Sequence, residues 1–374
     1  MRDIRDTRLA KLLVEYSINL QPGENCLIHA VDVPLEFGEE LVDAVCAVGG
    51  QPQVELTSVR LERALIEGAT EASLMSWADC DMYRMRKMDA FIGVRGPINT
   101  RETAGLSDGK LRLYRREYVQ KVHMDIRLPS TKWVVLRYPT ELMAYNASMS
   151  LRDFEDYFYK VTTEVDYHAM SEAMKKAKTF LEHADRVHIT GPGTDLTFSI
   201  RGMGAVPCDG EMNIPDGEIY SCPLRDSVEG YITYNTLSTY EGFTFTDVRL
   251  TFSKGRIVEA SANNTARINQ ILNTDEGARY IGEFALGCNP GITFPMDNTL
   301  FDEKIMGSFH FTPGNAYEDC DNGNRSAVHW DLVSIQTEQM GGGEIRIDGE
   351  LVRSNGKFVH EAFNDLNPES LLGS

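Results

Sequence analysis

Residues 22–56 read PGENCLIHAVDVPLEFGEELVDAVCAVGGQPQVEL, and this stretch decides the class of the fold. Pro22-Gly23 is a turn signal ahead of the apolar run 26–28, which predicts a strand. A helical pattern follows over 35–48, Gly49-Gly50 ends it, and residues 53–56 predict a second strand. A helix between two short strands is typical of a parallel βαβ unit.

The same alternation continues on both sides of this stretch. Apolar residues at helical spacing predict a helix over 2–16, and helical periodicity extends to residue 88. Strands are predicted over 90–94 and 133–138, and one or two amphipathic helices over 151–184. We therefore expect residues 1–184 to form an α/β domain with an open, mostly parallel sheet.

The second half of the chain has a different pattern. Short apolar runs separated by Gly, Asp, Asn and Pro predict strands at 187–189, 196–200, 230–234, 248–252 and 257–260. We expect residues 185–374 to form an α+β, β-rich second domain.

Charge and cysteine content exclude several classes of function. The 374 residues carry a formal net charge of -19, which disfavours nucleic acid and membrane partners because both are anionic. The N-terminus lacks the apolar run of a secretory signal, and no stretch approaches about 18 uninterrupted apolar residues. The seven cysteines include no C-x-x-C pair, which indicates reduced thiols and a cytoplasmic protein.

The first candidate site residues are a pair in the second half of the chain. No G-x-G-x-x-G or Walker A motif follows a predicted strand, so we expect no nucleotide cofactor. The segment 326–332 instead predicts a strand on which His329 and Asp331 face the same side. Such a pair is a common source of two metal ligands at a fixed separation.

Three further residues extend this pair. His310 lies in an apolar run, and Glu218 and Glu283 are acids in apolar surroundings, where a carboxylate is costly unless a cation compensates it. With His329 and Asp331 they form a set of N and O donors that suits Zn, Co, Mn or Mg. The set exceeds what one four-coordinate zinc requires, so two metals with a bridging carboxylate fit better. Phosphatases, nucleases and aminopeptidases all use such pairs, and composition does not choose among them.

Sequence blocks between Gly191 and Asp331 narrow this choice. They are GPGTDL at 191–196, NIPDGE at 213–218, TDEGAR at 274–279 with Gly282-Glu283, FDEK at 301–304, His310 with Tyr317, and NRSAVHWD at 324–331. In this order they resemble the aminopeptidase T family of metallo-aminopeptidases.

The resemblance implies a site and an activity. It implies that two divalent metals are bound by Glu218, Glu283, His310, His329 and Asp331. Tyr317 would lie beside them, as a ligand or as a hydrogen-bond donor to the oxyanion. The implied reaction is removal of N-terminal residues from short peptides by an activated water, with Glu218 or Glu283 as general base and Glu211 less favoured. The resemblance also implies a homodimer that encloses the site.

Two alternatives belong to other classes of function. The family is similar in sequence to 2,5-dihydroxypyridine dioxygenase, a ring-cleaving enzyme with one iron and a two-His, one-carboxylate set. The dioxygenase branch has His at the position of Glu283, and it lacks the acid at Glu218 and the histidine at His310. This chain has Glu218, Glu283 and His310. A non-catalytic relative is the second alternative, although such a protein would usually have lost ligands.

Overall fold

The computed structural model of the protein describes residues 3–99 and 101–372. The chain divides by its contacts into two compact units. The first comprises Met1–Thr163 and Gly210–Ile214, and the second comprises Glu164–Asp209 and Pro215–Ser374. The sequence pattern placed this boundary near 184, and the division into domains 1–184 and 185–374 stays a prediction.

The helix α9 (Tyr167–His183) explains why the contacts divide the chain after Thr163 and not near residue 184. It contacts β7 (Val206–Cys208) and β9 (Glu218–Ser221), and it buries one face that includes Met170 and Leu181. Its apolar stripe therefore belongs to the core of the second unit, which the charged sequence of 151–184 did not reveal.

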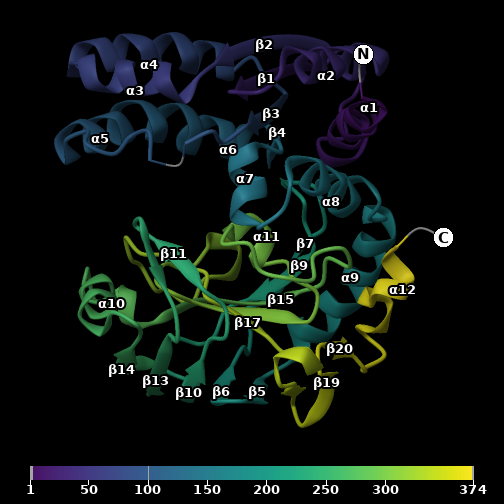
Figure 1. Cartoon of the computed structure of the whole chain (residues 1–374), viewed down its shortest axis with the longest axis vertical. Helices are drawn as coiled ribbons and strands as arrows, with labels where there is room; N and C mark the ends of the chain where they lie inside the picture. The colour runs from purple at the N-terminus through teal and green to yellow at the C-terminus, as the bar shows by residue number, and fades with distance from the viewer. Residues whose placement is uncertain (1–2, 100, 373–374) are drawn as a thin grey trace. The chain divides into compact units, whose positions relative to one another are not determined.

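The first unit is an α/β sandwich whose strands β1 to β4 are labelled in Figure 1. Its parallel sheet has the strand order β2-β1-β3-β4-β8. Its strands are β1 (Asn25–Val31), β2 (Gln51–Thr57), β3 (Ala90–Arg95), β4 (Lys132–Arg137) and β8 (Asn213–Ile214). Its helices are α1 (Ile4–Lys11), η1 (Leu12–Ser17), α2 (Leu35–Ala47), α3 (Val59–Gly68), α4 (Glu71–Met85), α5 (Asp108–Tyr114), η2 (Arg115–Arg127), α6 (Leu128–Ser130), α7 (Glu141–Asn146) and α8 (Leu151–Thr163). The predicted open parallel sheet is confirmed.

The alternation of side chains along β1 explains why helices cover both faces of this sheet. Leu27 packs with Phe91 of β3 against Ala78 of α4 and Val122 of η2. The neighbouring positions Cys26 and Ile28 point to the opposite face, because successive strand residues alternate. The helix α2 connects β1 to β2, whereas α3 and α4 connect β2 to β3 in the reverse direction. Right-handed connections in opposite directions place their helices on opposite faces.

A buried carboxyl group joins α1 to α8. Asp6 accepts hydrogen bonds from the hydroxyls of Tyr159 at 2.5 Å and Tyr138 at 3.2 Å. Burial raises the pKa of Asp6, and this effect exceeds the opposing effect of the two hydroxyl donors.

The second unit is built from antiparallel sheets, which confirms the predicted β-rich part. One sheet has the order β14-β13-β10-β6-β5-β18-β19-β20, a second has the order β17-β16-β15-β9-β7, and β11 pairs with β12. The remaining strands are β5 (Arg186–Gly191), β6 (Thr194–Ser199), β10 (Glu229–Thr233), β11 (Ser238–Tyr240), β12 (Phe243–Phe245), β13 (Arg249–Ser253), β14 (Arg256–Ser261), β15 (Ile281–Gly287), β16 (Ser308–Pro313), β17 (Val333–Ile335), β18 (Glu344–Ile347), β19 (Glu350–Ser354) and β20 (Lys357–Phe358). Its other helices are α10 (Thr265–Leu272), η3 (Gly277–Arg279), α11 (Thr299–Asp302), η4 (Glu318–Cys320), η5 (Glu338–Met340), η6 (Asn364–Leu366) and α12 (Pro368–Leu371).

The strands β9, β15 and β16 form the centre of this unit. Every residue of the three strands is buried. Polar side chains on them are therefore withdrawn from water and need partners within the protein or a bound ion.

One predicted strand is wrong. Residues 326–332 make only an isolated bridge, between His329 and Gly314, and β17 begins at Val333. The Asn and Ser side chains before His329 bind loop backbone instead: Asn324 Nδ2 donates to the carbonyls of Gly277 and Gly314. Such side-chain bonds compete with a strand ladder.

No helix within residues 3–99 and 101–372 is both long enough and apolar enough to cross a membrane.

Candidate metal centre

Three neighbouring strands bring together the first three predicted residues. Glu218 is the first residue of β9, Glu283 lies in β15, and His310 lies in β16. His310 Nε2 is 3.0 Å from Glu283 Oε1 and 3.6 Å from Glu218 Oε2. The three side chains are almost fully buried. A register shift between Ile281 and Glu283 locally alters the pairing of β15 with β16 beside this cluster.

His329 and Asp331 join the same cluster from the segment that follows the bridge at Gly314. His329 Nε2 lies 3.3 Å from Asp331 Oδ1 and 3.4 Å from Glu283 Oε2. The structure therefore brings together all five predicted ligands, although the two residues reach the site from a loop. Their assignment as ligands stays a prediction.

Each member of this pair also has a hydrogen bond to a group outside the cluster. His329 Nδ1 lies 2.9 Å from the Asn315 carbonyl oxygen, so this nitrogen donates its proton there and Nε2 faces the cluster. Thr312 Oγ1 donates to Asp331 Oδ1 at 2.9 Å. Such outer contacts are typical of metal ligands, whose tautomer and direction they fix.

The donor set fits a divalent metal. Among the described residues, Glu218 Oε2 and His329 Nε2 are buried and have no hydrogen-bond partner. Buried polar atoms are nearly always satisfied, so two orphaned atoms facing one cluster call for a missing partner. Donor atoms of Glu283, His310 and Asp331 also lie within 4.8 Å of one another.

The electrostatics of the cluster favour a cation. Burial alone would lower the pKa of His310 and His329, but the surrounding carboxylates outweigh burial and raise it. Burial raises the pKa of Glu218, whereas the neighbouring imidazoles of His310 and His329 hold the pKa of Glu283 below its ordinary value despite burial. The three acids thus create a negative site that, without metal, draws protons onto the histidines.

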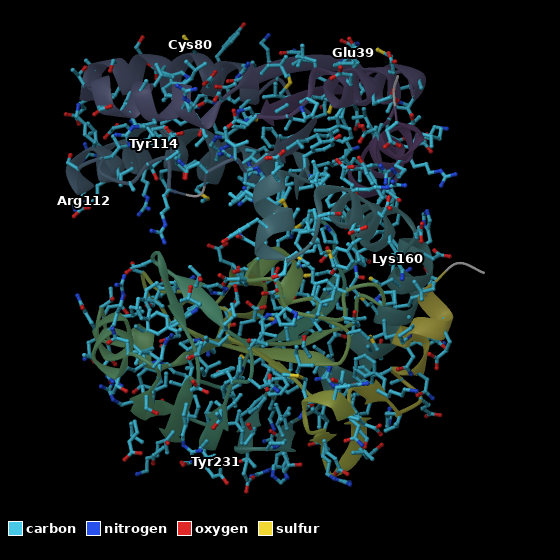
Figure 2. The ribbon with its side chains drawn as sticks, viewed as in Figure 1. Glu39, Cys80, Arg112, Tyr114, Lys160 and Tyr231 are labelled. Atoms are coloured by element: carbon cyan, nitrogen blue, oxygen red, sulfur yellow. The ribbon has the colours of Figure 1, made fainter. Side chains whose placement is uncertain are left out.

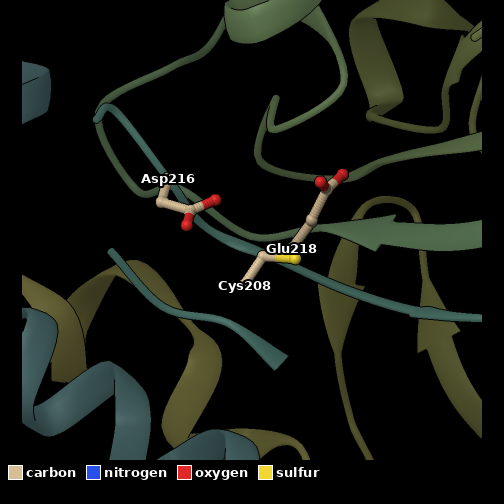
Figure 3. Close-up of side chains that lie close together, drawn as sticks. All are labelled: Cys208, Asp216 and Glu218. Carbon is tan, nitrogen blue, oxygen red and sulfur yellow. The ribbon is translucent and has the colours of Figure 1, made fainter. Parts of the chain in front are cut away.

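A second group of potential ligands lies beside the first, and it already holds a cation. Cys208, Asp216 and Glu218 present donor atoms within 4.8 Å of one another (Figure 3). The fully buried Lys304 Nζ lies 3.4 Å from Glu218 Oε1 and 3.8 Å from Asp216 Oδ1, and it also contacts the Glu303 carboxylate. The lysine ammonium therefore takes the place that a metal ion would need.

Lys304 and Glu303 are neighbours of the site that no sequence pattern indicated. They lie in the FDEK block at 301–304, where a lysine and two acids are indistinguishable from a solvated turn. Lys304 binds Glu218 through Oε1, which leaves Glu218 Oε2 directed at His310. Lys304 thereby orients one of the predicted metal ligands.

Tyr317 lies at the edge of the cluster. Its ring centroid is 4.7 Å from that of His329 and 5.8 Å from that of Tyr220, and the residue is 45% exposed. Its role stays a prediction. Glu211 is exposed in the segment 210–214 of the first unit, and its role as a base also stays a prediction.

Imidazoles and carboxylates gathered at one antiparallel sheet and an adjoining loop, in a chain that begins with an α/β unit, are typical of a metal-dependent enzyme. A sequence model of the family described as thermophilic metalloprotease (M29) matches residues 3–358. The chain belongs to this peptidase family and is a metallo-aminopeptidase that uses divalent metal and acts on peptides. The resemblance to the aminopeptidase T family is confirmed.

Individual relatives agree with this assignment. Aminopeptidase PepS of Streptococcus thermophilus is 26% identical over 94% of this chain and 97% of its own length. Aminopeptidase T of Thermus aquaticus is 32% identical over 44% of this chain and 45% of its own. The solved structure of wild-type AmpT from Thermus thermophilus has a TM-score of 0.75 at 22% identity, and the match covers 96% of this chain and 99% of that chain.

The dioxygenase alternative shares the fold. The structure of 2,5-dihydroxypyridine dioxygenase from Pseudomonas putida KT2440 matches with a TM-score of 0.61 at 13% identity, over 96% of this chain and 98% of that chain. Similarity at this level concerns architecture alone and does not carry the activity over.

Proposed function

We propose that this aminopeptidase removes the N-terminal residue of short peptides with two divalent metal ions bound by Glu218, Glu283, His310, His329 and Asp331. The observation that carries the proposal is the pair of orphaned buried atoms in one cluster: Glu218 Oε2, which is 3.6 Å from His310 Nε2, and His329 Nε2, which is 3.4 Å from Glu283 Oε2. Zn, Co, Mn and Mg all suit this donor set.

Glu283 is the residue that would bind both ions. Its two carboxylate oxygens face different imidazoles, Oε1 toward His310 and Oε2 toward His329. Divalent ions at such a site polarise a carbonyl group and lower the pKa of bound water. Glu218 and His310 would complete one side of the site, and His329 and Asp331 the other.

The protein's own groups would manage the proton and the oxyanion. Glu218 or Glu283 would accept the proton of the attacking water. Glu218 keeps Oε1 on Lys304, so only its Oε2 is left for the site. The hydroxyl of Tyr317 would donate a hydrogen bond to the oxyanion of the tetrahedral intermediate. The acidic surroundings would also attract the free α-amine of a peptide.

The test combines metal analysis with peptide hydrolysis. We expect about two divalent ions per chain and release of free N-terminal residues from short peptides with Co, Zn or Mn. Glu283→Ala should lose both metal and activity, whereas Glu276→Ala, which alters an exposed carboxylate of the same unit, should lose neither.

Two results would contradict the proposal. Full activity of Glu283→Ala would refute the site assignment. One iron per chain, no peptide hydrolysis, and oxygen uptake with a dihydroxypyridine would favour the ring-cleaving alternative.

We also propose a cytoplasmic homodimer. All seven cysteines are free thiols, as is usual in a reducing compartment. The homodimer rests on the family resemblance, and light scattering should give about twice the 41.9 kDa mass of the chain.

A further inference from the structure

The first unit contains a pocket for which the aminopeptidase reaction gives no role. It has a volume of about 290 Å3 and lies between the sheet and the helices α3, α4, α5 and η2. Its lining includes His29 of β1, Arg95 of β3, Glu62 of α3, Trp77 of α4 and Tyr114 of α5.

The topology of the sheet places this pocket where α/β folds bind ligands. β1 lies between β2 and β3 in the sheet. The connection from β1 leads to β2 on one side, and the connection from β2 then crosses β1 to reach β3 on the other side. The pocket is lined by Thr57 and Arg95, which are the last residues of β2 and β3. Crevices at the carboxyl ends of strands beside such a reversal are the usual binding sites of open parallel sheets.

One wall of the pocket is aromatic. Trp77 lies 4.1 Å from Tyr118 and 6.1 Å from Tyr114 between ring centroids, and the two tyrosines stack at 5.4 Å. Leu65 extends this wall. Trp77 and Tyr114 are only partly buried, so aromatic surface remains available to a ligand.

The pocket also offers opposite charges and neutral polar groups. Arg95 approaches Glu62 through two N–O distances of 3.4 Å, and the Arg95 side chain remains 46% exposed. His29 and His123 have no hydrogen-bond partner among the described residues. Burial lowers the pKa of both histidines to about 4, so each imidazole is neutral at pH 7.

We infer that this pocket binds a free amino acid with an aromatic or large apolar side chain. The long Arg95–Glu62 pair offers a cation to the α-carboxylate and an anion to the α-ammonium group. The wall of Trp77 and Tyr114 takes the side chain, and the neutral imidazoles supply additional hydrogen bonds. A ligand with one charge would match only half of this arrangement.

Tryptophan emission provides a direct test, because Trp77 lies in the pocket wall. L-phenylalanine should change the emission saturably, with millimolar or tighter affinity. Phenylalaninamide lacks the carboxylate and 3-phenylpropionate lacks the ammonium group, and each should bind at least about tenfold more weakly. Trp77→Phe should remove the signal, whereas calorimetry should still detect binding to that variant.

A matched pair of variants tests the cation. Arg95→Gln should weaken binding of L-phenylalanine by about tenfold or more. Arg112→Gln makes the same charge change at an exposed position of α5, outside the pocket lining, and should leave the affinity unchanged. Tyr114 and Arg112 are both labelled in Figure 2.

Three results would overturn the inference. They are no saturable signal with L-phenylalanine, an affinity for either singly charged analogue that equals the affinity for L-phenylalanine, and a signal that survives Trp77→Phe. The last result would trace the response to another tryptophan, such as Trp330 beside the metal centre. None of these measurements depends on hydrolysis, so their failure is distinct from failure of the proposed function.

Discussion

Lys304 is a cation that the polypeptide itself supplies to a buried group of acids. Its ammonium group contacts Asp216, Glu218 and Glu303. Removing one member of a buried ionic group leaves its partners uncompensated, which typically costs about 3–5 kcal/mol. Lys304→Met should therefore lower the free energy of unfolding by about this amount in denaturant titrations. Lys357→Met, at an exposed position of β20, should change it by less than about 0.5 kcal/mol. Equal effects of the two variants would refute this role of Lys304.

Tyr317 provides a test of catalysis that leaves the metal ligands intact. Its ring packs beside His329, and the proposed hydroxyl donor acts on the transition state. Tyr317→Phe should lower kcat by about 10- to 1000-fold while metal content and KM change little. Steady-state kinetics and metal analysis check this. If metal content falls together with kcat, Tyr317 is a ligand instead.

Asp6 should make the stability of the first unit depend on pH. Its folded pKa is raised above 3.8, so the folded state retains a proton that the unfolded chain loses. Stability contributed by this group is complete below the unfolded pKa and is lost as the pH rises through the folded value. Asp6→Asn removes this loss, so its stability relative to the parent protein should increase from pH 4 upward. If the difference in unfolding free energy between Asp6→Asn and the parent protein is the same at all pH values, this role of Asp6 is refuted.

At the scale of residues, the sequence indicated the buried polar side chains better than their surroundings, and their role as metal ligands stays a prediction. Glu218, Glu283 and His310 stood out because burying such groups requires compensation. Lys304 was not predictable in the same way. Its partners Glu218 and Asp216 are distant in sequence, and only the folded sheet brings them to its ammonium group.

At the scale of elements, the start of β15 controls the position of His329. A Cβ atom on Gly282 would lie 2.2 Å from the carbonyl oxygen of Asn315, which is the partner of His329 Nδ1. Gly282→Ala should displace this segment, lower the metal content, and destabilise the protein by about 1–3 kcal/mol. Gly109→Ala in α5 meets only Ser107 Oγ, at 3.9 Å, and should be neutral or slightly stabilising. Unchanged metal content in Gly282→Ala would refute the coupling.

The elements of the first unit were predictable because its local pattern and its fold agree. The stretch from Pro22 to Leu56 carries a turn, a strand, a helix and a second strand, and the structure has all of them. The segment 326–332 was not predictable, since its apolar alternation resembles a strand. Its actual conformation depends on hydrogen bonds from Asn324 to distant backbone groups.

At the scale of the whole molecule, removal of metal should affect one unit. The predicted ligands lie on β9, β15, β16 and the following loop, all in the second unit. Chelation leaves their carboxylates uncompensated and should accelerate amide hydrogen exchange in these strands. Strands β1 to β4 belong to the first unit and should exchange as before. Equal acceleration in both units, or none in β15 and β16, would contradict this expectation.

The two-part organisation was predictable from the change in pattern along the chain, but its border was not. The helix α9 is amphipathic like α8, and only the strands that it contacts assign it to the second unit. Likewise, two residues at Asn213–Ile214 are too short for any periodic signal, yet they pair with β4.

That two-residue strand has a consequence for engineering. The chain passes from one unit to the other at Thr163, returns at Gly210 and leaves again after Ile214. Consider a hybrid enzyme that joins the N-terminal part of one relative to the C-terminal part of another at Thr163. Its strand β8 would come from one parent and the strands β1 to β4 of the same sheet from the other. Recombination that respects the fold needs three junctions, so that β8 is inherited together with β1 to β4.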